Sequence, residues 1–204
     1  MPRRSAHSTY ARLVGEIAIA WNLLERRLES LIAHYFLVDP YTAGFVLGEM
    51  RNETKAEFAK FLIEMNESDE LLRSSGLHFV ALCNRLRENR NILEHASPVS
   101  FSEQYHGTIY KTDKRGYAVE FGAPVEQLRA LLKTMQDAAP YARWIVFCLT
   151  MLSDEVFDGI GGGPTTADAA LRVLASIDKP PLPDKIAPLR PRATQENAKR
   201  PRGS

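Results

Sequence analysis

The sequence predicts a mainly α-helical protein: an antiparallel up-and-down bundle of four long helices, with a β-hairpin insertion and a short C-terminal helix. Two observations predict this fold class. Four long segments carry apolar residues at steps of three and four, which is the spacing of one helix face. Short turns join them, which favours antiparallel neighbours. The 204 residues are 45% hydrophobic and 25% charged, ordinary values for a globular domain, which we place at residues 1–177.

The first predicted helix covers about residues 9–36 and ends near Asp39-Pro40, because the residue before a proline avoids helical backbone. Its apolar stripe consists of Leu13, Ile17, Trp21, Leu24, Leu28, Leu31 and Tyr35. The second helical region covers about residues 41–65. A break near Asn52 is compatible with the sequence, because the segment 54–57 has the form of a capping box.

The third predicted helix covers about residues 70–96, with Ser68 as its candidate N-cap, and stops before Pro98. Alternating apolar residues around the turn Asp113 to Gly116 then predict a β-hairpin over about residues 107–121.

The fourth helix covers about residues 124–152, where Pro124 suits a first turn and Pro140 should kink the helix. A short last helix ends near Ile177. The glycine-rich stretch 159–164 lacks the Lys-Ser/Thr of a phosphate loop and no strand precedes it, so we interpret it as a linker.

Residues 178–204 form a basic tail that we expect to be disordered, because it contains six prolines and little apolar content. Its seven Lys or Arg against three Asp or Glu give a net charge of +4, although the whole chain carries only +1. The remaining residues are therefore slightly acidic, which excludes a broadly basic nucleic-acid-binding surface. Any attraction to phosphate must be local or come from the tail.

The sequence also bears on compartment and cofactors. It has no secretory signal and no apolar run near the roughly 20 residues that cross a bilayer, so we expect a cytoplasmic protein without membrane contact. Cys83 and Cys148 lie among apolar residues, which favours buried free thiols. The five histidines show no metal-ligand spacing, and no Gly-x-Ser-x-Gly element is present. We therefore expect no metal, no cofactor and no serine hydrolase site.

The third helix carries the best candidate site. At about 100° per residue, Arg90 falls within the apolar arc of Phe79, Cys83, Leu86 and Leu93. A guanidinium there is costly unless it is paired or reaches a polar interface. A polar column follows another face at offsets of four, three and four residues, and consists of Asn84, Glu88, Asn91 and His95. A solvated face with an arginine in a structural ion pair is the alternative interpretation.

The segment Arg90-Asn91-Ile92-Leu93-Glu94-His95 resembles the Arg-x4-6-His motif of HEPN-domain proteins, in which a polar residue, often Asn, follows the arginine. That family has the motif at the end of a long helix in a small bundle, and includes metal-independent ribonucleases of toxin–antitoxin, CRISPR and phage-defence systems as well as inactive members. The resemblance in architecture covers about residues 9–152, whereas its specific part is six residues. The predicted hairpin after the motif departs from the family pattern.

The resemblance implies a role for each residue. RNA supplies its own nucleophile, the ribose 2′-hydroxyl, so His95 would act as general acid or base. Arg90 would stabilise charge on the phosphorane-like transition state, since its planar fork matches phosphate oxygens. Asn91 would orient the imidazole or the substrate. Glu88, Asn84 and Arg87 are candidate substrate-binding residues, and Glu88 is the weakest because a carboxylate repels phosphate.

Arg90 and His95 are five residues apart and diverge by about 140° around an ideal helix, so one helix does not easily direct both at one phosphate. Two copies across a two-fold axis could build a composite site. The resemblance implies the same, because HEPN active sites form at a dimer interface. We therefore expect a homodimeric endoribonuclease that binds RNA and has a possible cognate antitoxin or regulatory protein. The alternatives are a non-catalytic HEPN-like dimerisation or partner-binding module, and a generic helical scaffold.

Overall fold

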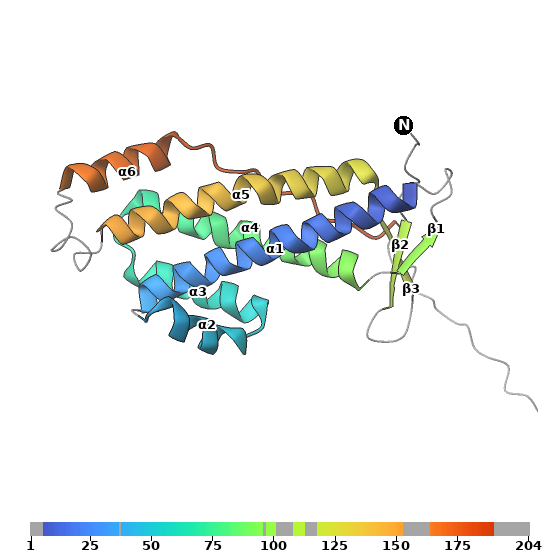
Figure 1. Ribbon diagram of the computed structural model, residues 1–204, viewed down its shortest axis with the longest axis horizontal. Helices are drawn as coiled ribbons and strands as arrows, with labels where there is room; N and C mark the ends of the chain where they lie inside the picture. The colour runs from blue at the N-terminus through green and yellow to red at the C-terminus, as the bar shows by residue number, and fades with distance from the viewer. Residues whose placement is uncertain are drawn as a thin grey trace, which may run out of the picture.

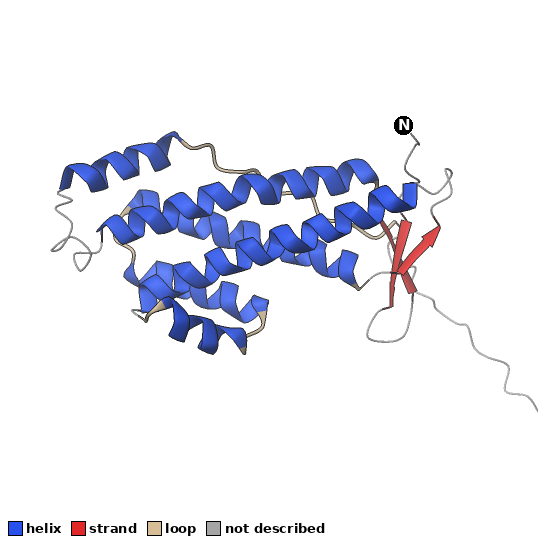
Figure 2. Ribbon diagram, viewed as in Figure 1, coloured by secondary structure: helices blue, strands red, loops and turns tan. Residues whose placement is uncertain are grey.

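A computed structural model of the chain describes residues 6–36, 38–95, 97–100, 108–112, 118–152 and 164–189 (Figure 1). The protein is mainly helical, with a small antiparallel sheet at one end of the long helices (Figure 2). The predicted mainly α class with a hairpin insertion is therefore confirmed. None of the described helices is long and apolar enough to cross a membrane.

Helix α1 (Ala6–Phe36) follows the predicted first helix closely. The second predicted helical region is two helices, α2 (Pro40–Gly48) and α3 (Asn52–Asn66), so the break near Asn52 that the sequence allowed is confirmed. Asp39 caps α2 by accepting from the backbone N–H groups of Tyr41 and Thr42, both at 3.0 Å. The expected capping box at residues 54–57 is wrong, since these residues lie inside α3.

Helix α4 (Glu70–Glu94) matches the third predicted helix. Its N-cap is Asp69 rather than the predicted Ser68. The Asp69 carboxylate accepts from the backbone N–H of Leu72 at 2.9 Å. A carboxylate at this position also interacts favourably with the positive end of the helix dipole.

The sheet has the strand order β1-β2-β3, with β1 (Ser97–Ser100), β2 (Thr108–Thr112) and β3 (Ala118–Gly122). Strands β2 and β3 are the predicted hairpin, in which Ile109 pairs with Phe121. The proposed turn at 113–116 lies outside the described residues. Strand β1 was not predicted. It is short, has an irregular register and contains Pro98, which a sheet tolerates at an edge.

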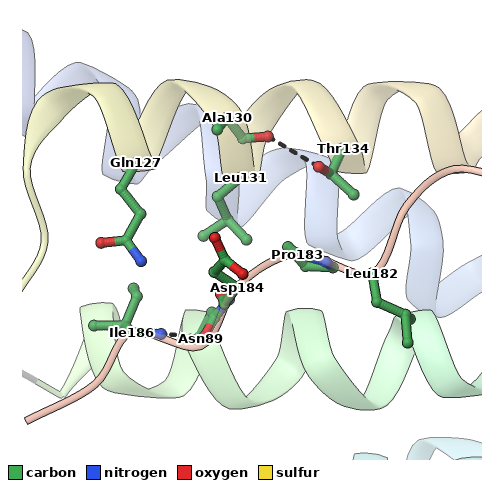
Figure 3. A pocket seen from close by; sticks show the side chains of 9 residues that line it. All are labelled: Asn89, Gln127, Ala130, Leu131, Thr134, Leu182, Pro183, Asp184 and Ile186. Carbon is green, nitrogen blue, oxygen red and sulfur yellow. Dashed lines mark hydrogen bonds between the residues drawn. The ribbon is translucent and has the colours of Figure 1, made fainter.

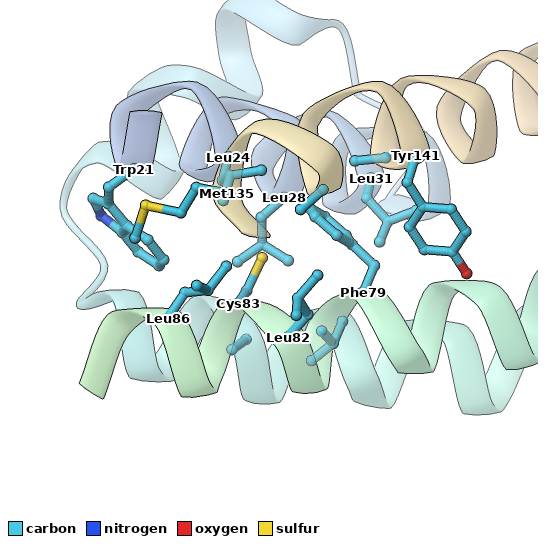
Figure 4. Close-up of a cluster of buried hydrophobic side chains, with 14 of the residues drawn as sticks. Trp21, Leu24, Leu28, Leu31, Phe79, Leu82, Cys83, Leu86, Met135 and Tyr141 are labelled. Atoms are coloured by element: carbon cyan, nitrogen blue, oxygen red, sulfur yellow. The ribbon is translucent and has the colours of Figure 1, made fainter. Parts of the chain in front are cut away.

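Helix α5 (Val125–Leu152) is the fourth predicted helix and continues through Pro140, while α6 (Pro164–Ser176) is the predicted short last helix. Most of the predicted linker, residues 159–163, lies outside the described residues. The core lies where α1, α4 and α5 meet, with α3 packed against α1 and α4. Figure 4 shows apolar side chains of these helices directed toward one another: Trp21, Leu24, Leu28 and Leu31 of α1, Phe79, Leu82, Cys83 and Leu86 of α4, and Met135 and Tyr141 of α5.

The prediction that the tail is disordered from residue 178 is wrong for its first half. Residues 178–189, which we call the C-terminal strap, run back along the bundle after α6 (Figure 1). Pro180 and Ile186 are buried. The backbone N–H of Leu189 donates to the carbonyl of Glu120 at 2.9 Å, which joins the strap to β3. Polar side chains of α4 hold the backbone of the strap, so a proline-rich segment docks with little apolar content. Residues 190–204 lie outside the described residues.

Candidate functional site

The C-terminal end of α4 carries Arg90 and Asn91, is followed directly by His95, and contacts β2 through Lys111. The side chain of Arg90 is 23% exposed, which agrees with the half-buried position expected for a guanidinium within the apolar arc. Its Nε lies 2.5 Å from Oε1 of Glu94, one turn further along α4. This contact is an ion pair without hydrogen-bond geometry, because Nε has no hydrogen-bond partner. The guanidinium is therefore neutralised within its own helix.

Asn91 connects Arg90 to the sheet. Its Oδ1 accepts from NH1 of Arg90 at 3.1 Å, and its backbone carbonyl lies 3.4 Å from Nζ of Lys111 on β2. Lys111 thus brings a second cation to the end of α4. Sequence reasoning missed Lys111, because strand pairing rather than local sequence brings it there. Glu94 could have been found, since an acidic residue four positions after an arginine is a common helical ion pair.

His95 is the C-cap residue of α4, with φ −100° and ψ 8°, and its side chain is exposed. Because His95 lies after the last helical residue, the direction of its side chain relative to Arg90 does not follow from about 100° per residue. The 140° divergence expected for an ideal helix therefore does not apply strictly. The exposed imidazole is accessible to a substrate or to a second protein molecule.

The remaining candidate residues do not converge on this point. The Glu88 carboxylate lies 2.8 Å from Nζ of Lys185 in the strap and 3.9 Å from Nε of Arg85. Arg87 is directed toward α3, where its NH1 lies 3.5 Å from the Glu53 carboxylate. Asn84 is half-buried about two turns before Arg90. The geometry thus brings Arg90 and Asn91 together, with His95 nearby, and separates Glu88 and Arg87 from them.

The polar face of α4 has a second role that the sequence did not predict. Five of its side chains contact the strap: Ser74, His78, Arg85, Glu88 and Asn89. Asn89 is buried, and its amide donates to the carbonyl of Asp184 at 2.8 Å while its Oδ1 accepts from the N–H of Ile186 at 2.9 Å. This pairing imitates the hydrogen bonds of a neighbouring strand. No local signal links Asn89 to a segment 95 residues away.

The strap leaves a hollow between itself, α4 and α5, with a volume of about 190 Å³. Figure 3 shows Gln127 and Leu131 of α5 facing Asp184 of the strap across it. A cavity of this size is smaller than the 300–1,000 Å³ typical of small-molecule sites. It lies on the strap side of α4 and does not include Arg90 or His95.

A second charged cluster lies between α1 and α3. Lys55 is 3% exposed, and its ammonium donates to Glu25 and Glu29, both at 2.7 Å. Burial lowers the pKa of Lys55, but hydrogen bonds and charge interactions with the two carboxylates outweigh burial and raise it overall. A buried, doubly paired ammonium of this kind joins two helices.

Within the described residues, no group of three or more His, Cys, Asp or Glu side chains is placed to hold a metal ion. Comparisons with known proteins give no significant match to a family, a curated protein or a solved structure. The functional assignment therefore depends on the chain's own residues.

Proposed function

We propose that the protein is a metal-independent endoribonuclease of the HEPN type, in which α1, α3, α4 and α5 form an up-and-down bundle. The observation that supports this most is the end of α4, where a half-buried arginine, an asparagine bonded to it and an exposed histidine lie within six residues. Lys111 adds positive charge beside them. Cations with forked donors recognise phosphate, and an imidazole transfers protons near neutral pH.

The chemistry assigns one step to each residue. In the proposed reaction, His95 removes the proton of the ribose 2′-hydroxyl as a general base and, as the imidazolium, donates it to the leaving 5′-oxygen. The 2′-oxygen then attacks the adjacent phosphorus, the bond to the 5′-oxygen breaks, and a 2′,3′-cyclic phosphate remains. Arg90 stabilises the extra negative charge on the non-bridging oxygens during this step. Asn91 holds Arg90 through its Oδ1, which makes it a positioning residue.

We further propose that the active form is a homodimer with a composite site. Arg90 is tied to Glu94 in its own subunit, while His95 is exposed at the helix end. A second subunit across a two-fold axis can present its own His95 to the phosphate held by Arg90. The exposed position of His95 supports this arrangement. A role in toxin–antitoxin or phage-defence systems, with an antitoxin as partner, follows from the same resemblance.

The test is cleavage of a fluorescent single-stranded RNA by the full-length protein in EDTA, with products analysed for a cyclic phosphate. His95→Ala should lower the rate by about 10²–10⁴, the usual contribution of a general acid or base. Arg90→Lys keeps the charge and loses the fork, so it should also lower the rate strongly. Asn91→Ala should have an intermediate effect.

Glu88→Gln is the matched control, because Glu88 lies on α4 but pairs with Lys185 of the strap. It should leave the rate within about two-fold of wild type, since it contacts neither Arg90 nor Asn91. Melting curves of all four variants must match that of wild type. Equal RNA degradation by wild type and His95→Ala would identify a contaminating nuclease and reject the proposed activity.

A second candidate function is a non-catalytic HEPN-like dimerisation or partner-binding module. One observation favours it: the Arg90–Glu94 ion pair already neutralises the arginine that a catalytic site needs. Glu94→Gln distinguishes the two functions. In a ribonuclease it should strengthen RNA binding and steepen the salt dependence, because a cation is released for phosphate. In a module without a phosphate site, RNA affinity should not change.

A further inference from the structure

Five large apolar side chains are exposed near one end of the helices. The exposed fractions are 89% for Tyr41, 79% for Phe45, 67% for Met65, 56% for Phe61 and 51% for Phe36. We call this set the aromatic face. Single exposed apolar residues are normal, whereas several aromatic residues together mark an interaction site. None of the five residues belongs to the proposed RNA site.

Contacts between α1 and α3 place the members of the aromatic face on these two helices near one another. The Tyr35 hydroxyl donates to the Glu67 carboxylate at 2.6 Å, which brings the end of α1 beside the end of α3. The rings of Phe36 and Phe58 meet edge to face, with centroids 5.6 Å apart. Because α2 begins only four residues after Phe36, its first turn belongs to the same end of the molecule. Figure 1 shows α2 at the end of the long helices opposite the sheet.

The helical spacing directs these side chains outward. On α2, Ala43 and Leu47 are buried against α1, while Tyr41 and Phe45, also four residues apart, are exposed. The segment Pro40–Gly48 contains no charged residue at all. A helix that is apolar on its exposed side as well as its buried side lacks a partner for one of them.

The segment that carries four of the five residues of the aromatic face is acidic. Residues 39–70 contain eight Asp or Glu against three Lys or Arg, a net charge of −5 in a chain whose total is +1. Of the three basic residues, Lys55 is buried against Glu25 and Glu29, and Lys60 lies 3.8 Å from Glu64. The aromatic face therefore lies in a net acidic segment, which we call the acidic rim, and Arg87 of α4 offsets only Glu53 within it.

We propose that the aromatic face docks a basic amphipathic helix of another protein. The apolar side of such a helix would pack on Phe45, Phe61 and their neighbours, while its Lys and Arg residues would pair with the acidic rim. A second copy of this chain fits less well, because its own aromatic face has the same negative rim and like charges repel. An anionic lipid surface is disfavoured for the same reason.

The docked helix would leave the end of α4 accessible. Glu70 begins α4 near the aromatic face, and Arg90 lies 20 residues later, about 30 Å along the helix. The inference is therefore independent of the proposed ribonuclease activity, and holds equally for a non-catalytic module.

The test measures binding of three fluorescein-labelled 18-residue peptides to the full-length protein by anisotropy. The first contains Leu and Lys at amphipathic helical spacing, the second has the same composition in scrambled order, and the third replaces every Lys by Glu. The first should bind at least about ten-fold more tightly than the other two, because only it matches both the apolar face and the charge. Its affinity should fall as salt is added.

Variants locate the site. Phe45→Ser combined with Phe61→Ser should weaken binding of the amphipathic basic peptide by about ten-fold or more, since central aromatic residues dominate such interfaces. Ile19→Ser is the matched control, because Ile19 is 72% exposed on α1 but lies 17 residues before Phe36. It should change affinity by less than about two-fold. All of these positions are exposed, so the melting temperatures should stay unchanged.

Three results would overturn the inference. The scrambled or acidic peptide could bind as tightly as the amphipathic basic one. The double serine variant could bind like wild type or no worse than Ile19→Ser. Sedimentation could show that wild type self-associates at micromolar concentration and that the double variant does not, which would assign the aromatic face to a second copy of this chain.

Discussion

Replacing Asn89 by alanine should release the part of the C-terminal strap around Asp184 and Ile186. Asn89 is 1% exposed and makes two hydrogen bonds to the strap backbone, at 2.8 Å to Asp184 and 2.9 Å from Ile186. Losing both bonds costs about 1 kcal/mol each, and leaving a buried backbone group without a partner costs about 1–3 kcal/mol. Local release of residues 184–186 sets the upper limit, because their freed polar groups then meet water and the main loss is the burial of Ile186, which contributes about 1.5–3 kcal/mol.

We therefore expect Asn89→Ala to lower the free energy of unfolding by about 2–3 kcal/mol, or the melting temperature by about 5–10 °C. Urea denaturation gives the free energy, and hydrogen exchange at the Ile186 amide reports detachment directly. Asn84→Ala is the matched control, because Asn84 is half-buried on the same helix and none of the strap contacts of α4 involves it. It should cost less than about 0.5 kcal/mol.

A double-mutant cycle separates the strap from any effect within α4. In a chain ending at Ile177, Asn89 has no strap to hold, so Asn89→Ala should then cost less than about 0.5 kcal/mol. Equal losses in the full-length and shortened chains would refute the argument. So would a shortened chain that is less than about 1 kcal/mol less stable than the full one.

Two further predictions concern buried groups. Lys55→Met should destabilise the protein by about 2–4 kcal/mol in thermal denaturation, because it leaves Glu25 and Glu29 without their ammonium partner, although water partly screens them. Since the folded-state pKa of Lys55 is raised, its contribution to the free energy of unfolding is complete below about pH 10.5 and is lost as pH rises through the folded-state pKa. The stabilities of wild type and Lys55→Met should therefore converge in alkaline solution. A constant difference up to pH 12 would contradict this. Burial raises the pKa of Cys83 and raises that of Cys148 to about 11. Neither thiol should therefore react with an aromatic disulfide reagent at pH 8 until the protein is unfolded in urea. Rapid labelling of the native protein would contradict this, because it would show that a thiol is accessible.

The long helices could be predicted from sequence because each has a long apolar stripe. The stripe of α1, from Leu13 to Tyr35, fixes both its existence and its buried face. Helix caps were less predictable, since Asp69 and Ser68 are adjacent and both are good cap residues. The spacing of the apolar residues on α4 similarly predicted that Arg90 would be half-buried.

Features made by distant segments could not be predicted. The strap has little apolar content. Its docking depends on side chains of α4 such as Asn89, which form hydrogen bonds with the backbone of the strap and make no use of its side chains. Backbone recognition of this kind leaves no pattern in the recognised segment. Lys111 reaches the end of α4 only because β2 lies beside that end, so the sequence around residue 111 does not show it.

The composite active site is the central claim, and mixing two inactive variants tests it most directly. Arg90→Ala and His95→Ala subunits, co-expressed in equal amounts, form heterodimers in about half of all dimers, and each heterodimer keeps one intact site of two if Arg90 and His95 come from different subunits. We predict that RNA cleavage in EDTA returns to about a quarter of the wild-type rate. A mixture that stays as inactive as either variant alone, beside an active wild type, would contradict the composite site.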